Sequence, residues 1–255
     1  MIRPRVLVIG GTDSSGGAGI QADLRALAAI GADAAVAVTA VTAQTMTEVR
    51  SVTPVAVELV RDQVGAALDE PVGAVKVGLL PTVETVEAVG AILEDLDVPI
   101  VVDPVRRAST GDALGEETDD AMRQFVLPHA TVATPNRAEL ASLGDRTITD
   151  LVGLRSAAVA LAHAGPAWVL ATGGHLAGPE AVDVLTDGDR IVELFGPRID
   201  CDVRGTGCTL ASLLAGCLCD DGDVVSAARA AKRHLNRMLD TLVVTPSGRA
   251  RFGPG

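Results

Sequence analysis

The sequence is poor in aromatic residues and in lysine. Only 2% of its 255 residues are aromatic, tyrosine is absent, and the only two lysines are Lys76 and Lys232. Proteins that bind nucleic acids need clustered basic residues for the phosphates, and often aromatic rings for the bases. This chain has 33 acidic and 21 basic residues, a net charge of −12 and no basic run. We therefore expect no nucleic-acid partner.

Cysteine pairs and long apolar runs are also missing. The cysteines at positions 201, 208, 217 and 219 form no CxxC pair and the four histidines are scattered, which argues against a structural zinc site. No apolar run approaches the roughly 20 residues of a membrane helix. The first residues lead straight into a short apolar strand, unlike a signal peptide. We expect no membrane contact and a cytoplasmic location, where disulfides are disfavoured.

Hydrophobic residues make up 48% of the chain, enough for one large core, so we expect residues 1–255 to form a single domain. Short β-branched runs alternate with amphipathic stretches. Strands are expected at 6–10, 34–42, 74–79, 99–103, 131–133 and 167–171, and helices at 19–30, 55–68, 83–96, 118–125, 137–143, 150–164, 207–218 and 224–242. This alternation predicts an α/β fold, a three-layer αβα sandwich around a mostly parallel sheet.

Two segments near the C-terminus depart from this alternation. Residues 181–186 and 190–195 flank Asp187-Gly188-Asp189, a pattern typical of a hairpin, so we expect an antiparallel edge to the sheet. Residues 247–255 have no regular pattern, and we expect a frayed tail there.

Small or polar residues follow most of the predicted strands. In a parallel sheet, ligands bind beyond the carboxyl ends of the strands, so these residues predict the position of a site. They are Gly11-Thr12-Asp13, Gln44, Gly78-Leu79, Asp103-Pro104, Thr134-Pro135-Asn136 and Thr172-Gly173-Gly174.

The turn from Arg204 to Thr209 precedes an apolar helix and contains Gly205-Thr206-Gly207-Cys208. Such a turn can aim successive backbone amides at one point, where the positive end of the helix dipole favours a phosphoryl group. A helix N-terminus also lowers the pKa of a thiol, which would make Cys208 a base for a substrate hydroxyl. A tight turn with a small packed cysteine explains the same residues, and this segment alone does not decide between the two.

The glycine-rich stretch at residues 10–19 contains a G-x-x-x-x-G spacing from Gly11 to Gly16, but Gly17-Ala18 stand where a P-loop needs lysine and serine or threonine. It also lacks the G-x-G-x-x-G of a dinucleotide fold at the strand exit. We interpret it as a loop that covers a small-molecule pocket, or as a plain connection between strand and helix.

Four further polar residues have two interpretations each. Asn136 and Glu139 have the spacing of a capping box, although the same atoms suit magnesium and phosphate, as does the strand-end Asp103. Asp23 on the first helix and Gln44 at the end of an apolar strand could satisfy local backbone, and Gln44 could equally bind the donor–acceptor edge of a heterocycle.

Four segments together resemble one family: residues 10–23 (GGTDSSGGAGIQAD), 39–44 (TAVTAQ), 134–139 (TPNRAE) and 205–208 (GTGC). From about Val6 to the helix that contains Lys232, the chain resembles the hydroxymethylpyrimidine and phosphomethylpyrimidine kinases of thiamine biosynthesis, within the ribokinase-like superfamily. The resemblance implies a ribokinase-like fold. It also implies ATP-dependent phosphorylation of 4-amino-5-hydroxymethyl-2-methylpyrimidine and of its monophosphate.

The resemblance also implies roles for particular residues. Gln44 would bind the aminopyrimidine in a pocket lined by Gly11, Asp23 and Val105. Cys208 would act as the base, with the amides of Gly205, Thr206, Gly207 and Cys208 forming the anion hole. Asp103 and Glu139 would lie near Mg²⁺. The residues near the phosphates and the nucleotide of ATP would be Asn136, Thr172, Gly173, Gly174, Arg204 and Lys232. Members of the family are commonly homodimers.

The chain departs from the family pattern around the phosphates. The family often has lysines where Ser109 and Thr172 stand here, apolar residues in place of Arg106 and Arg107, and a histidine in place of Arg204. We hypothesise that one of these three arginines restores phosphate binding. Two other functions stay open: a kinase for pyridoxal or another hydroxymethyl heterocycle, and a non-catalytic sensor that binds the pyrimidine.

Overall fold

The computed structural model describes residues 4–108, 110–174, 176, 178–199 and 201–253. Its main sheet has nine strands in the order β3-β2-β1-β4-β5-β6-β7-β8-β9. The strands are β1 (Arg5–Gly11), β2 (Asp33–Gln44), β3 (Val49–Pro54), β4 (Ala74–Val77), β5 (Ile100–Val102), β6 (Val132–Ala133), β7 (Trp168–Ala171), β8 (Glu180–Thr186) and β9 (Ile191–Pro197). Six neighbouring strands, in the sheet order β2-β1-β4-β5-β6-β7, are parallel to one another. The strands β3, β8 and β9 each pair antiparallel with their neighbours, so both edges of the sheet are antiparallel.

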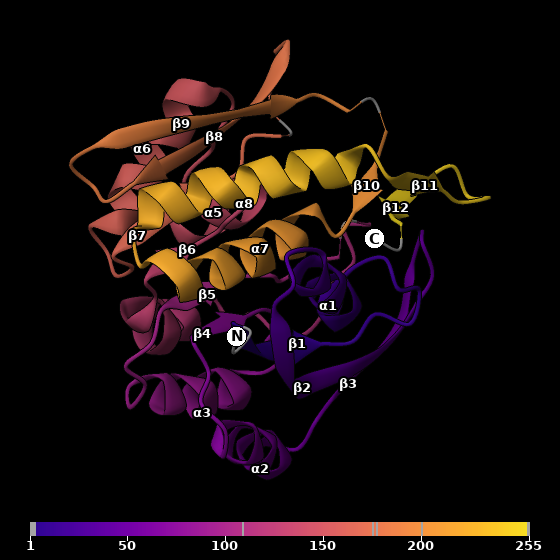
Figure 1. Ribbon diagram of the computed structural model, residues 1–255, viewed down its shortest axis with the longest axis vertical. Helices are drawn as coiled ribbons and strands as arrows, with labels where there is room; N and C mark the ends of the chain where they lie inside the picture. The colour runs from indigo at the N-terminus through magenta and orange to yellow at the C-terminus, as the bar shows by residue number, and fades with distance from the viewer. Residues whose placement is uncertain (1–3, 109, 175, 177, 200, 254–255) are drawn as a thin grey trace.

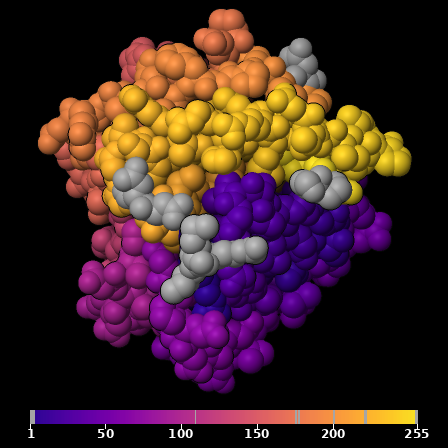
Figure 2. Space-filling view, viewed as in Figure 1, coloured from indigo at the N-terminus to yellow at the C-terminus, as the bar shows by residue number. Residues whose placement is uncertain are grey.

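Helices cover both faces of this sheet, and α7 and α8 lie side by side with α1 next to α7 (Figure 1). One face carries α1 (Gly19–Ala29), α7 (Thr206–Asp221) and α8 (Val224–Leu239), and α8 forms a yellow band across it (Figure 2). The other face carries α2 (Val57–Leu68), α3 (Val83–Leu93), α5 (Arg137–Leu143), α6 (Leu151–Ala162) and the short turns α4 (Asp119–Ala121), η1 (Met122–Val126) and η2 (Leu127–His129). The three-layer prediction is confirmed.

The sheet separates two apolar cores. Successive side chains of a strand point to opposite faces, so Leu7 and Ile9 pack toward α2 whereas Val6 and Val8 pack toward α1 and α7. All four side chains are 0% exposed. Burial on both faces explains why the central strands are continuously apolar in the sequence.

Two sequence-based expectations about the chain's edges were incomplete or wrong. The strand β3 was not predicted, because its residues are mostly exposed and show no apolar alternation. The C-terminal residues 247–255 are not a frayed tail over their described part. Their strand β12 (Ala250–Phe252) lies between β10 (Val203–Arg204) and β11 (Leu242–Val244) in a second, three-stranded sheet, and Phe252 is 0% exposed.

The topology brings the functional candidates together. The carboxyl ends of the six parallel strands meet at one edge of the sheet, and the turn before α7 arrives there through β10. The hairpin predicted around Asp187-Gly188-Asp189 joins β8 to β9 and is confirmed. No helix in the described part of the chain is both long and apolar enough to cross a membrane.

Candidate active site

A cavity of about 1040 Å³ lies at the carboxyl ends of the parallel strands. The predicted site residues Gly11, Asp23, Gln44, Asp103, Val105, Asn136, Glu139, Thr172, Gly174, Arg204, Gly205, Thr206, Gly207, Cys208 and Lys232 all line it. Gly173 does not line the cavity, because it packs behind the wall, where an added Cβ would stand 2.0 Å from the Val182 carbonyl oxygen.

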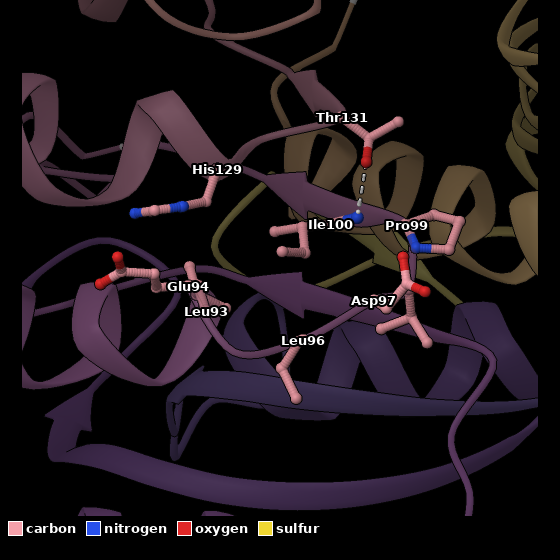
Figure 3. A pocket seen from close by; sticks show the side chains of 9 residues that line it. Leu93, Glu94, Leu96, Asp97, Pro99, Ile100, His129 and Thr131 are labelled. Atoms are coloured by element: carbon pink, nitrogen blue, oxygen red, sulfur yellow. Dashed lines mark hydrogen bonds between the residues drawn. The ribbon is translucent and has the colours of Figure 1, made fainter.

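A smaller hollow of about 380 Å³ lies where β5 and β6 begin (Figure 3). Its wall includes Glu94, Asp97 and His129, and the Thr131 hydroxyl accepts a hydrogen bond from the Ile100 amide at 3.0 Å. None of the segments expected to bind a ligand reaches this end of the sheet. The large cavity is therefore the candidate active site.

The turn before α7 is held in a conformation that favours glycine. Gly205 has φ +77°, and a Cβ there would lie 2.3 Å from the Gly17 carbonyl oxygen, so the turn packs directly against the glycine-rich loop. Thr209 donates its amide to the Gly205 carbonyl at 2.9 Å as the first helical bond. The preceding amides of the first turn have no helical acceptor and lie at the cavity wall, which suits an anion.

Cys208 differs from the expectation. The half-buried residue lies at the cavity wall, where burial raises the pKa of its thiol well above the ordinary value. Lys76 opposes this rise, whereas the Asp103 and Asp23 carboxylates add to it. The prediction that this pKa is lowered is wrong, because desolvation and two nearby carboxylates raise it.

Lys76 is a site residue that the sequence analysis missed. Its side chain is 1% exposed. The ammonium group lies 3.0 Å from Asp23 Oδ1 and 3.9 Å from Asp103 Oδ2, and Asp23 raises its pKa against the effect of burial. Ser212 donates to the same Asp23 oxygen at 2.8 Å, while burial raises the pKa of Asp23. The signal was present in the sequence, since a single lysine inside a four-residue apolar strand must have a buried partner.

Asp103 and Glu139 lie at the centre of the cavity wall. Asp103 Oδ2 is buried without a hydrogen-bond partner, and burial and the Asp103 charge raise the pKa of Glu139 well above its ordinary value. Asn136 and Glu139 form the predicted capping box, in which Glu139 Oε2 accepts from the Asn136 amide at 2.8 Å. The described residues contain no group of three acidic, histidine or cysteine side chains that could hold a metal by themselves. A Mg²⁺ ion shared between one or two carboxylates and substrate phosphates fits this donor set.

Arg204 does not offer the free charge that we hypothesised for phosphate. The residue is 1% exposed, and its guanidinium donates to Asp13 Oδ2 at 3.1 Å and to Gln44 Oε1 at 2.8 Å. It also donates to the Thr45 and Met46 carbonyl oxygens. These protein acceptors hold the side chain in the cavity wall.

The other two arginines lie at the cavity too. Arg106 is paired with Asp119 and donates to Ser142, whereas Arg107 is exposed and donates to the Gly111 carbonyl oxygen at 2.9 Å. Arg107 is the more accessible of the three arginines. Ser109, one of the positions that depart from the family pattern, lies outside the described residues.

The opposite end of the cavity is formed by α8 and the β8–β9 hairpin. Lys232 on α8 donates to Asp183 Oδ2 at 2.6 Å, and Asp183 Oδ1 accepts from the Gly173 amide at 3.1 Å. Asn236, one turn further along α8, has a buried Oδ1 with no hydrogen-bond partner. Asp183 and Asn236 were not predicted, since neither stands in a recognisable motif.

Residues 13–249 of the chain match the model of the family described as phosphomethylpyrimidine kinase. A curated relative, the hydroxymethylpyrimidine/phosphomethylpyrimidine kinase of Streptomyces coelicolor, is 46% identical over 235 residues, which are 91% of this chain and 87% of the relative.

Solved structures with the same fold include two kinases. The ADP complex of Bacillus subtilis pyridoxal kinase has a TM-score of 0.91 and 30% identity, covering 99% of this chain and 98% of the other. Phosphomethylpyrimidine kinase from Clostridium difficile 630 has a TM-score of 0.81 and 29% identity, covering 93% of this chain and 100% of the other. The predicted ribokinase-like fold agrees with both neighbours.

Proposed function

The chain belongs to the phosphomethylpyrimidine kinase family, and we propose that it transfers the γ-phosphoryl group of ATP to 4-amino-5-hydroxymethyl-2-methylpyrimidine and then to the resulting monophosphate. One observation carries the proposal: the Gly205–Cys208 turn, Asp23 and Gln44, from three distant segments, line one cavity. We propose that residues 1–255 act as a single kinase domain.

In the first step, the hydroxyl oxygen of the substrate attacks the γ-phosphorus as the bond to the β-phosphate oxygen breaks, and ADP leaves. The amides of Gly205, Thr206 and Gly207 face the transferring group and stabilise the charge on its oxygens. The hydroxyl proton passes to Cys208 Sγ. For that transfer the thiol must be ionised. Burial holds its pKa high, and Lys76 is the neighbouring cation that opposes this rise.

Further residues bind and orient the two substrates. Gln44 contacts the amino-substituted edge of the ring, above an apolar wall that includes Leu79 and Val105. Asp103 and Glu139 would hold Mg²⁺, which when bound neutralises charge on the phosphates. Thr172, Gly174 and Lys232 lie at the end of the cavity proposed for the nucleotide.

The test is a kinase assay with ATP·Mg²⁺ and three acceptors: the aminopyrimidine alcohol, its monophosphate and pyridoxal. We expect the highest kcat/KM with the two pyrimidines. Turnover of pyridoxal alone would replace this function by that of a pyridoxal kinase. Binding of the pyrimidine without ADP formation would replace it by that of a sensor. The homodimer that the family suggests is tested separately, by light scattering of the purified chain.

A further inference from the structure

Arg204 connects the turn before α7 to the part of the cavity wall that carries Gln44. Its buried guanidinium donates to Asp13, Gln44, Thr45 and Met46, which lie 158 to 191 positions earlier in the chain. The strand β2 and Ser14 hold the Gln44 backbone, but Arg204 is the residue of the turn segment that bonds the Gln44 side chain. The orientation of that side chain relative to the turn therefore depends on Arg204.

The Gln44 amide has only one orientation that its neighbours allow. A guanidinium has no acceptor, so the atom facing Arg204 at 2.8 Å must be the Gln44 carbonyl oxygen. On the other side, Gln44 Nε2 lies 2.8 Å from Thr42 Oγ1, and this hydroxyl already donates its hydrogen to the Thr12 carbonyl oxygen at 2.6 Å. Thr42 can therefore only accept, and both neighbours specify the same amide orientation.

We propose that Arg204 is the positioning residue that makes the cavity select an amino-substituted ring. The oriented Gln44 amide keeps one lone pair on Oε1 and one hydrogen on Nε2 for a ligand. That pair complements an amine next to a ring nitrogen. The proposal rests on the proposed function and deepens it by naming what sets its preference for the ring.

Asp13 keeps Arg204 in this place. Asp13 Oδ1 accepts from the amide and hydroxyl of Ser15 at 2.9 and 2.7 Å, and Asp13 Oδ2 accepts from the Ala18 amide at 2.9 Å as well as from Arg204. The glycine-rich loop thus fixes the carboxylate, which in turn fixes the guanidinium. Leaving Asp13 to reach a phosphate would cost Arg204 a buried ion pair.

The test compares Arg204→Lys with a matched control, Arg249→Lys. Lysine at position 204 keeps a charge for Asp13 but lacks the fork that holds Gln44 and the carbonyl oxygens together. Arg249 also donates to the Met46 carbonyl oxygen, at 3.1 Å, but it pairs with Asp202 and does not line the cavity. Each protein is assayed with the aminopyrimidine alcohol and with the same alcohol lacking the amino group.

In the wild type and in Arg249→Lys, we expect removal of the amino group to raise KM about tenfold, the size of one lost hydrogen bond. In Arg204→Lys we expect the two alcohols to have the same KM, because the Gln44 amide is no longer held in one orientation. If Arg204→Lys does not fold, Thr42→Val loosens the other end of the amide and should also lower the KM ratio.

Each other outcome overturns the inference in a recognisable way. If Arg204→Lys or Thr42→Val keeps the wild-type KM ratio, Arg204 has only a structural role while the proposed function stands. If the wild type phosphorylates both alcohols with equal KM, it does not select for the amine. If the wild type phosphorylates neither, the proposed function and the inference both fail.

Discussion

The two ends of the cavity differ in how the side-chain amides that line them, Gln44 and Asn236, are bonded within the protein. At the end formed by β1, β2 and β10, both oxygens of Asp13 and both side-chain atoms of Gln44 have protein partners. At the end formed by α8 and the β8–β9 hairpin, the buried Oδ1 of Asn236 has none, and a Cβ on Gly174 would meet nothing within 4 Å. The Gln44 amide is thus oriented by the protein itself, whereas the Asn236 oxygen at the end proposed for the nucleotide is left free to accept a hydrogen bond.

Cys208 lies at the cavity wall that both ends share, and its replacement should have the largest effect. We expect Cys208→Ala to lower kcat by about 10²–10⁴, the usual contribution of a general base. Cys208→Ser should be nearly as slow, because a serine hydroxyl ionises far less readily than a thiol. Single-turnover assays with melting curves would check both. If the serine variant keeps most of the activity, Cys208 orients the alcohol and accepts no proton.

Lys76 tests how strongly a buried ion pair between the two ends stabilises the protein. We expect Lys76→Met to lower the free energy of unfolding by about 3–5 kcal/mol, because it leaves the Asp23 and Asp103 carboxylates buried without their cation. Arg50→Met is the control, since Arg50 and Glu48 form an exposed pair worth less than about 1 kcal/mol. Urea unfolding measures both variants. Equal losses would mean that burial adds nothing to the Lys76 pair.

Lys232 tests the other end. We expect Lys232→Met to raise KM for ATP about tenfold or more, as expected when a charged hydrogen-bond donor is lost, and to leave KM for the alcohol unchanged. Arg233→Met, on the exposed side of the same helix, should change neither constant. Initial rates at varied ATP and varied alcohol separate the two KM values. A rise in both would show that the two ends are not independent.

The smallest expected effect is on the free energy of unfolding when a side-chain amide is removed. Asn236→Leu removes an acceptor that has no partner, so we expect the free energy of unfolding of the ligand-free protein to stay unchanged or to rise slightly. Gln63→Leu is the matched case, because Gln63 bonds both the amide and the carbonyl of Val38 at 3.0 and 3.1 Å. Its loss should cost about 1–2 kcal/mol in urea unfolding. If Asn236→Leu costs as much, the Asn236 oxygen has a hydrogen-bond partner in the ligand-free protein.

Much of the fold was predictable because its signals are local. Buried parallel strands are continuously apolar and helices repeat every 3.6 residues, so the predicted elements of the main sheet, its covering helices and the late hairpin agree with the structure. The strand β3 and the strand β12 gave no such signal. The former is largely exposed, and the latter is three residues long and anchored by the single buried ring of Phe252.

The candidate site was predictable as a place but not as a set of contacts. Polar residues at strand ends predicted which segments meet, since the topology of a parallel sheet fixes where those ends lie. The partners of Arg204 and the raised pKa of Cys208 could not be predicted, because they depend on side chains that are distant in sequence and on the depth of burial. Their binding and catalytic roles stay predictions until the variants above are measured.

Both lysines of this chain are buried in ion pairs: Lys76 beside Asp23 and Asp103, and Lys232 beside Asp183. An activated ester can acylate a lysine amine only after that amine has separated from its carboxylate and lost its proton. The rates of acylation at Lys76 and Lys232 therefore report how often each of these two buried ion pairs opens. Mass spectrometry of one proteolytic digest, prepared with and without nucleotide, measures acylation at both lysines. It would compare the local stability of the two ion pairs without an engineered probe.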